Sequence, residues 1–170
     1  HYSVLLNEAI ENLNIKEDGI YVDATLGLGG HSSKILERLT TGHLYAFDED
    51  KMAIDYADKR LAKINSNYTI IKSNFVNLKA KLEELGVTAI DGIVFDLGVS
   101  SPQIDTASRG FSFSKDGLLD MRMDTDSPLT AEQVVNEYKK EELANIFFNY
   151  GEEKQSRLIA SKIVAKRPIK

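Results

Sequence analysis

The chain has 170 residues, of which 42% are hydrophobic and 28% are charged. This is the composition of one globular domain and excludes a disordered polymer. The 21 Lys+Arg residues and 26 Asp+Glu residues give a formal net charge of -5, which argues against a polybasic nucleic-acid coat. Cysteine is absent, which excludes disulfides, thiolate zinc sites and cysteine nucleophiles. Without a long apolar run or a signal-peptide pattern, we expect a cytoplasmic protein with no membrane partner.

The charge is distributed unevenly along the chain. All 26 acidic residues lie within residues 1–153, and the segment 154–170 contains bases and no acid: Lys154, Arg157, Lys162, Lys166, Arg167 and Lys170. A solvated helix face accounts for such a segment, and so does a patch that binds a polyanion.

Hydrophobic runs and turn residues alternate regularly over the first 97 residues. Helical spacing predicts helices over 3–13, 32–39, 53–64 and 78–85. Runs rich in β-branched and aromatic residues predict strands over 19–25, 43–48, 68–73 and 90–97. This alternation indicates a parallel sheet covered by helices on both faces, in which ligands bind beyond the carboxyl ends of the strands.

The alternation stops near residue 98. Residues 98–128 are polar and show little periodicity, and three further helices are predicted over 130–138, 140–150 and 152–166. Thr130 and Gln133 have the spacing of a capping box at the start of the first of these helices.

Polar residues follow each predicted strand. A glycine-rich loop (27–30) after Asp23 lets the backbone approach a ligand. Asp48 is placed to receive ribose hydroxyls, Phe75 to offer an aromatic face to a base, and Asp96 adds a further acid. Together these strand ends predict a site for a nucleoside-containing cofactor.

Simpler structural roles remain open for the same residues. The glycines can form only a tight turn, and Asp48 can cap the next helix. Asp96 can be a turn residue, Phe75 a core residue, and His31 an ordinary residue at a helix start.

The acids favour a cationic cofactor over a dinucleotide. The dinucleotide motif requires glycine where this chain has Ser32, and Asp23 would repel a pyrophosphate. S-adenosylmethionine carries a sulfonium and an ammonium but no phosphate, so nearby acids attract it. The pattern therefore favours a methyltransferase.

Two other enzyme classes fit less well. An NAD-linked oxidoreductase needs a hydride-handling group beyond the fourth strand, but the histidines are His1, His31 and His43. A serine hydrolase is disfavoured because Pro102 replaces the second glycine of the nucleophile elbow and no later histidine follows. No clustered ligands predict a metal site.

Several segments together resemble one family. YVDATLGLGGHS (21–32), YGEEKQSRLIASKI (150–163) and above all VFDLGVSSPQIDTASRGFSFSKDGLLDMRMD (94–124) are similar to the MraW-type (RsmH) ribosomal RNA methyltransferases, and the resemblance covers essentially the whole chain. It implies an enzyme that uses S-adenosylmethionine to methylate the N4 amine of a cytosine in 16S rRNA of the small ribosomal subunit.

The resemblance also implies a fold and a division into parts. The fold is a Rossmann-like class I methyltransferase sheet, left incomplete and followed by the start of an inserted helical domain. The parts are a cofactor-binding domain (1–108), a connecting substrate loop (109–128) and a partial helical domain (129–170). Family members are nearly twice as long, so a catalytically inert cofactor-binding fragment is the alternative, and a homodimer stays open.

Matching the family's motifs residue by residue gives the cofactor contacts: Gly29, Gly30, His31, Asp48, Phe75, Asp96 and Gln103. The resemblance alone supplies Gln103; the others also follow from the strand ends.

The substrate side is predicted from the chemistry of the reaction. A cytosine amine is a poor nucleophile, and hydrogen bonds from its N–H groups to acceptors raise its electron density. Asp96 and the segment Ser100–Pro102, with Ser100 as the second catalytic candidate, are placed to accept them.

The loop after these residues supplies the RNA candidates. Phe111 or Phe113 can grip an unstacked base or only anchor the loop. Arg109, Arg122 and Lys115 can contact RNA phosphates or pair with the acids Asp116, Asp120 and Asp124.

Overall fold

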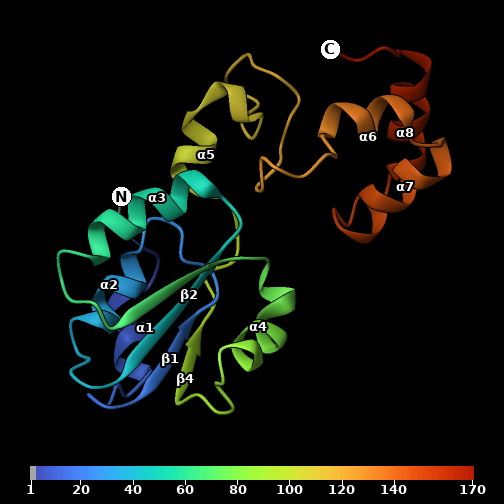
Figure 1. Cartoon of the computed structure of the whole chain (residues 1–170). Coiled ribbons are helices and arrows are strands. Elements are labelled where there is room, and N and C mark those ends of the chain that lie inside the picture. Colours follow the sequence, from blue (N-terminus) through green and yellow to red (C-terminus); the bar gives the residue numbers. More distant parts are fainter. Residues whose placement is uncertain (1–2) are drawn as a thin grey trace. The chain divides into compact units, whose positions relative to one another are not determined.

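The computed structural model describes residues 3–170, so His1 lies outside the described part. The chain folds into two compact units that divide between Gly98 and Val99. The first unit is the strand–helix region, and the second contains the later helices (Figure 1). This division falls earlier than residue 108, and it groups segment 99–128 with the helices that follow it.

The first unit is built on the parallel sheet that the sequence predicts. Its strands are β1 (Ile20–Asp23), β2 (His43–Asp48), β3 (Tyr68–Lys72) and β4 (Gly92–Val94), in the order β3-β2-β1-β4. All neighbouring strands are parallel, and Asp23 is in register with Ala46 of β2 and Val94 of β4. The carboxyl ends of the strands therefore meet at one edge, where the candidate site residues lie.

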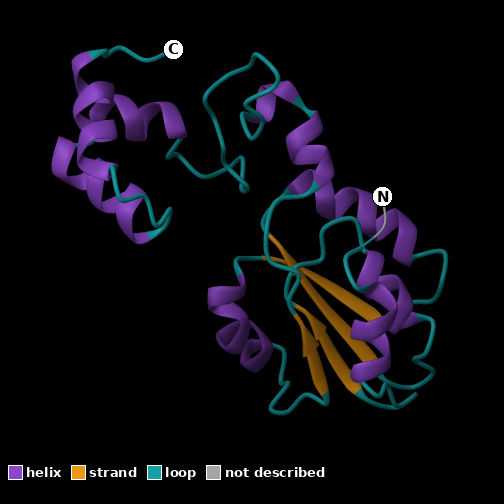
Figure 2. Ribbon diagram, turned by 180° about the vertical axis from the view of Figure 1, so that it is seen from behind, coloured by secondary structure: helices purple, strands orange, loops and turns teal. Residues whose placement is uncertain are grey.

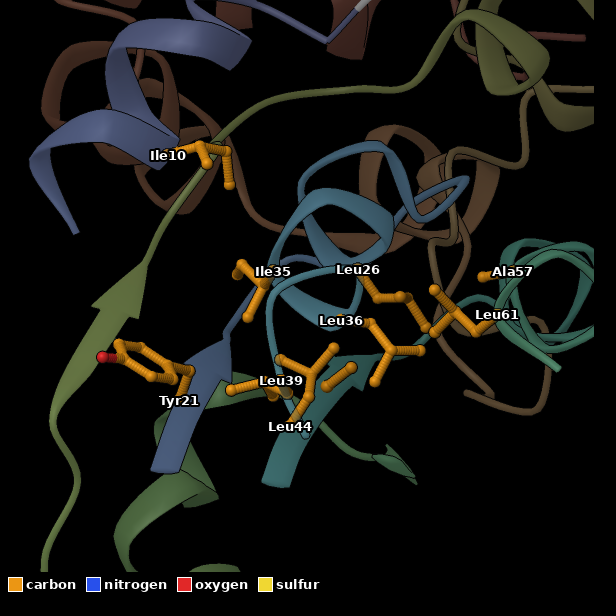
Figure 3. Packing of buried hydrophobic residues seen from close by; sticks show 10 residues of the cluster. Ile10, Tyr21, Leu26, Ile35, Leu36, Leu39, Leu44, Ala57 and Leu61 are labelled. Atoms are coloured by element: carbon orange, nitrogen blue, oxygen red, sulfur yellow. The ribbon is translucent and has the colours of Figure 1, made fainter. Parts of the chain in front are cut away.

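Helices cover both faces of this sheet (Figure 2). One face is covered by α1 (Leu6–Asn12), α2 (Gly30–Leu36) and α3 (Lys51–Leu61), and the other by α4 (Leu78–Glu84), which follows the 3-10 turn η1 (Phe75–Asn77). Strand residues alternate between the two faces. Tyr21 and Leu44 pack toward α2 and α3 (Figure 3), whereas Val22 and Phe47 pack with Leu82 of α4. Burial on both faces explains the nearly continuous apolar strands.

Strand β4 is shorter than the predicted range 90–97. It pairs with β1 only, and the exposed side chains of Phe95 and Leu97 follow it. After Val94, a side chain just beyond β1 replaces the backbone as the hydrogen-bond acceptor: Thr25 Oγ1 accepts the N–H of Asp96 at 2.7 Å. The chain therefore leaves the sheet where the site begins.

The second unit contains the three predicted helices, now α6 (Ala131–Glu137), α7 (Lys140–Asn149) and α8 (Ser156–Ala165). Leu143 and Ala144 of α7 and Ala160 of α8 form its small core. The predicted capping box of Thr130 and Gln133 is confirmed. The unit also holds a short helix that was not predicted, α5 (Ser101–Asp105), and a 3-10 turn, η2 (Ala107–Arg109). Within residues 3–170, no helix combines the length and apolarity needed to cross a membrane.

Candidate cofactor site at the sheet edge

The candidate site lies where the strand order reverses. The chain places β2 and β3 on one side of β1 and then crosses to place β4 on the other side. Such a switch point opens a crevice at the carboxyl ends of the two central strands. Here His31 Nδ1 lies 3.9 Å from Asp96 Oδ2, and Thr25 holds the backbone N–H of Asp96. Two of the predicted cofactor contacts, His31 and Asp96, are thus side by side.

The glycine-rich loop runs from β1 into α2. Gly29 precedes α2 with φ of 75°, and a Cβ there would lie 3.3 Å from the Cβ of Ala57 on α3. A side chain at Gly30 would collide with Ser3. The tight-turn role proposed for the glycines is therefore real at Gly29, and it is compatible with a ligand contact through the backbone.

Asp23 lies behind the glycine-rich loop. Its carboxylate is 1% exposed and accepts hydrogen bonds from Ser32 Oγ at 2.7 Å and from the Thr25 N–H at 3.1 Å. Burial raises the pKa of Asp23, and the hydrogen bonds from Ser32 and Thr25 offset part of that rise. Asp23 thus ties the end of β1 to the first turn of α2. This hydrogen bond was not predicted, although Ser32 departs from the dinucleotide motif.

Asp48 closes the next strand end. Its two carboxylate oxygens accept the N–H groups of Gly27 at 2.7 Å and of Asp50 at 2.8 Å. The cap of α3 is Asp50, which accepts the N–H of Met52, so Asp48 is not the helix cap. Burial raises the pKa of Asp48, and the hydrogen bonds from Asp50 and Gly27 act against the rise. A carboxylate accepts about four hydrogen bonds, so these contacts leave it capacity for a ligand.

Phe75 is part of an exposed aromatic pair. Its side chain is 42% exposed, so it is not a core residue. The ring of Phe95, 49% exposed, meets it edge-to-face with centroids 5.7 Å apart. Asn74 caps the turn that carries Phe75 and bonds to Glu49 after β2. Phe95 was not among the predicted site residues, although its position directly before Asp96 was a signal for it.

Ser100 and Gln103 belong to the second unit, where they form a capping box on α5. The Gln103 side-chain oxygen accepts the N–H of Ser100 at 2.9 Å, and Ser100 Oγ accepts the N–H of Gln103 at 3.4 Å. Gln103 is buried. Each of these two candidates therefore has a local structural role.

The arginines of the following loop hold that loop together. Arg109 is buried and donates to the carbonyl oxygens of Arg122 and Met123. Arg122 forms an ion pair with Asp120 at 2.7 Å, as expected if it pairs with an acid of the loop rather than with RNA phosphates. The hydrogen bond from Arg122 lowers the pKa of Asp120.

The other loop candidates differ in exposure. The Arg109 guanidinium lies 5.9 Å from the ring centroid of the half-buried Phe111, whereas the side chain of Phe113 is fully exposed. Lys115 pairs with Asp105 at 3.4 Å. Phe111 is therefore the anchoring aromatic residue of the loop, and Phe113 is the accessible one. No group of three His, Cys, Asp or Glu side chains that could hold a metal ion occurs among residues 3–170.

The parallel sheet, the glycine-rich loop after its first strand and the acids at successive strand ends define a Rossmann-like domain of the methyltransferase type. A family model described as the MraW methylase family matches residues 1–170. The chain therefore belongs to the MraW methylase family.

Similar proteins agree with this membership. The chain is 58% identical over 169 residues to the ribosomal RNA small subunit methyltransferase H of Exiguobacterium sibiricum, covering 99% of this chain and 54% of that protein. It is 54% identical to the protein of the same name from Mycoplasmopsis agalactiae, over 99% of this chain and 56% of that protein. The chain thus spans about half the length of the curated relatives it matches.

A solved structure supports the fold. The putative rRNA methylase from Clostridium thermocellum superposes with a TM-score of 0.51 and 23% identity, over 58% of this chain and 53% of that one. The predicted Rossmann-like fold is confirmed.

Proposed function

We propose that the first unit binds S-adenosylmethionine, and that the longer protein it represents methylates the N4 amine of a cytosine in 16S rRNA of the small ribosomal subunit. The observation that carries this proposal is the acidic crevice at the switch point, where Asp96 lies beside His31 and Asp48 closes the neighbouring strand. No Lys or Arg occurs in segment 23–33. The charged side chains at the strand ends are acids, which attract a cation and disfavour a phosphate; Arg60 of α3 donates to the loop carbonyl of Leu28.

The residues at this edge fit the parts of such a cofactor. Asp48 has acceptor capacity for ribose hydroxyls, and the exposed pair of Phe75 and Phe95 offers apolar surface to the adenine. Gly29 and Gly30 bring backbone close to the ligand. When bound, S-adenosylmethionine supplies an electrophilic methyl group on its sulfonium sulfur.

On the substrate side, the chain's own groups orient the amine and exclude water. Asp96 accepts a hydrogen bond from the cytosine amine or from the cofactor's ammonium. Alignment of the amine with the methyl carbon is worth several kcal/mol in such reactions, since effective molarities reach about 10⁵ M or more. Phe113 is the accessible ring for holding the base.

The names of the relatives support the substrate class. Both are ribosomal RNA small subunit methyltransferases, and the cytoplasm is where such a substrate is found. Because the chain covers about half of each relative, turnover is proposed for the longer protein, and the inert cofactor-binding fragment is the second candidate for the chain alone.

Calorimetry tests the cofactor. We expect the chain to bind S-adenosylmethionine and not NAD, and Asp96→Ala to weaken binding about tenfold or more, the loss of one charge-assisted hydrogen bond. Asp55→Ala, which removes an exposed carboxylate paired with Lys51 on α3, is the matched control and should bind as the unaltered chain does. Preferential NAD binding would refute the proposal.

A methylation assay tests the reaction. Small-subunit particles are incubated with the chain and, in parallel, with a full-length relative. Methyl incorporation by both supports an active unit, and incorporation by the relative alone supports the inert fragment. Methylation of a base other than cytosine, or at a position other than N4, would overturn the proposed substrate.

A further inference from the structure

Helix α8 carries basic side chains that have no acidic partner. In the first unit, several lysines pair with acids of their own helices, such as Lys34 with Glu37 at 2.7 Å and Lys51 with Asp55 at 2.8 Å. The segment around α8 has no acid at all. None of its exposed bases makes an ion pair or side-chain hydrogen bond within residues 3–170: Lys154, Arg157, Lys162 and Lys166. Their charges are available to a partner.

The bases of α8 lie on both flanks of its exposed surface. Ser156 and Ala160 are buried, and Ala160 packs with Ile163 against α7. With 3.6 residues per turn, Lys162 and Lys166 lie about 40° apart on the side away from Ala160, whereas Arg157 lies about 180° around the helix from Lys166. Between them lie the exposed Leu158, Ser161 and Ala165. From Arg157 to Lys166 the bases extend over about 14 Å at 1.5 Å per residue. We name this surface, with Lys154, the α8 basic face.

A hollow between α7 and α8 adjoins the α8 basic face. Its volume is about 360 Å³, and its lining comes from both helices: Lys140, Glu141, Ala144, Asn145, Arg157 and Ser161. Lys140 is partly neutralised by Glu141 at 3.8 Å. The amide of Asn145 and the hydroxyl of Ser161 add hydrogen-bond donors beside Arg157. Tyr150, 87% exposed, lies on the turn that leads toward α8.

Arg167 is a contrast on the same segment. Its guanidinium donates to the carbonyl oxygens of Val135 and Tyr138, so it serves the fold of the second unit. The bases of 154–170 thus divide into the structural Arg167, the four bases of the α8 basic face, and Lys170, which follows the helix.

We propose that the α8 basic face binds the phosphodiester backbone of the RNA substrate. This rests on the proposed function and adds the surface that holds the strand. A group of exposed, unpaired bases spread over about 14 Å of one helix suits the repeated charges of a polynucleotide. Asn145 and Ser161 suit phosphate or ribose oxygens, and an exposed aromatic such as Tyr150 suits stacking on an unpaired base.

The salt dependence of binding gives the expected size of the effect. For a single strand, the slope of log K against log salt is about −0.7 per neutralised phosphate. Four contacts give a slope of about −2.8, which is a loss of about 50-fold in affinity between 50 and 200 mM salt. Removing two contacts leaves a slope of about −1.4 and a loss of about sevenfold over the same range.

The test compares two charge reversals of equal size. The variant Lys162→Glu/Lys166→Glu alters the α8 basic face. The control Lys59→Glu/Lys63→Glu alters two exposed, unpaired lysines with the same spacing at the end of α3. Binding of a labelled single-stranded RNA of about 20 nucleotides is measured by fluorescence anisotropy from 50 to 200 mM salt. Binding of S-adenosylmethionine is measured in parallel by calorimetry.

We expect the α8 variant to halve the salt slope and the control to leave it within experimental error of the unaltered chain, with cofactor binding unchanged in both. Equal losses in both variants would mean that net charge alone matters, and would overturn the inference. So would an unaltered slope in the α8 variant, or binding to phosphatidylserine vesicles with none to RNA. If the unaltered chain does not bind S-adenosylmethionine, but the salt slope of its RNA binding still depends on the α8 basic face, the proposed function is refuted and the RNA-binding surface is supported.

Discussion

The hydrogen bond between Ser32 and the buried Asp23 carboxylate offers a sharp test of how the glycine-rich loop is held. Replacing Ser32 with alanine removes one oxygen and leaves Asp23 with the Thr25 N–H as its remaining bonded partner among those described above. A neighbouring residue supplies the control. Ser33 is also buried on α2, but its hydroxyl donates to the neutral carbonyl of Gly29.

The two substitutions should differ in cost because only one of them leaves a buried charge. A hydrogen bond to a charged group contributes about 1.5–3 kcal/mol, and one between neutral groups about 0.5–1.5 kcal/mol. The carbonyl of Gly29 also keeps the backbone N–H of Ser33 as a donor. We therefore expect Ser32→Ala to lower the free energy of unfolding by about 2 kcal/mol at pH 7, and Ser33→Ala by about 1 kcal/mol or less.

The pH dependence identifies the cause. Burial raises the folded-state pKa of Asp23 above its ordinary value of 3.8. Above pH 3.8 the folded chain therefore holds a proton that the unfolded chain has released, so stability falls as the pH rises toward the folded-state pKa. Ser32→Ala raises that pKa further. The difference between the two variants should therefore grow from acidic to neutral pH.

Urea unfolding followed by far-UV circular dichroism at pH 4.5 and pH 7 measures both variants. Equal losses for Ser32→Ala and Ser33→Ala at both pH values would refute the reasoning, since the charge of Asp23 would then contribute nothing. A pH dependence of equal size in both variants would refute it too.

Three further predictions concern the loop, the aromatic pair and the second unit. Gly29→Ala should destabilise the first unit by about 1–2 kcal/mol, measured as a lower urea midpoint, because φ of Gly29 is 75° and Ala57 is close. Gly86 has a similar φ but open space around it, so Gly86→Ala measures the backbone strain without the contact to Ala57. Phe75→Ala should weaken binding of S-adenosylmethionine about fivefold or more, because stacking of an aromatic ring on a base is worth about 1–3 kcal/mol. The ring is exposed, so little stability should be lost. Calorimetry measures the binding, with Phe148→Ala as an exposed aromatic control. Arg122→Ala should expose segment 120–128 to limited proteolysis, because it removes the bonds to Asp120 and to the carbonyls of Thr125 and Ser127; an unchanged cleavage pattern would contradict this.

The periodicity of the sequence predicted the elements of the first unit because both faces of its sheet are buried. Strand 43–48 has the predicted bounds, and the helices that follow differ only at their ends. The prediction of strand 90–97 was too long, because hydrophobic residues such as Phe95 and Leu97 continue the pattern after the ladder has ended. The sequence pattern does not reveal that the Thr25 hydroxyl, rather than a backbone carbonyl, accepts the N–H of Asp96.

The candidate site was predicted as a set of strand-end residues, and the structure brings His31 and Asp96 together. The hydrogen-bonding roles of its neighbours depend on tertiary contacts that sequence spacing does not encode. Asn74 and Glu49 meet because β2 and β3 end at one edge, and Asp23 meets Ser32 because the glycine-rich loop brings the first turn of α2 back to the end of β1. In the second unit, Arg109 and Arg122 looked like phosphate ligands, but their guanidinium groups hold backbone carbonyls of the loop.

The net charge of −5 takes on a different meaning once the charges are placed in the fold. In the first unit, Asp23 and Asp48 are held by backbone or hydroxyl donors rather than by lysine or arginine. Their negative potential is therefore not cancelled locally, and it favours a cationic ligand while disfavouring a polyphosphate. The α8 basic face has the opposite character, since its bases have no acidic partner. An acidic chain can thus bind a cationic cofactor and an anionic polymer when the two charge types lie in different units, and the slope of RNA affinity against salt measures the second of these separately from the first.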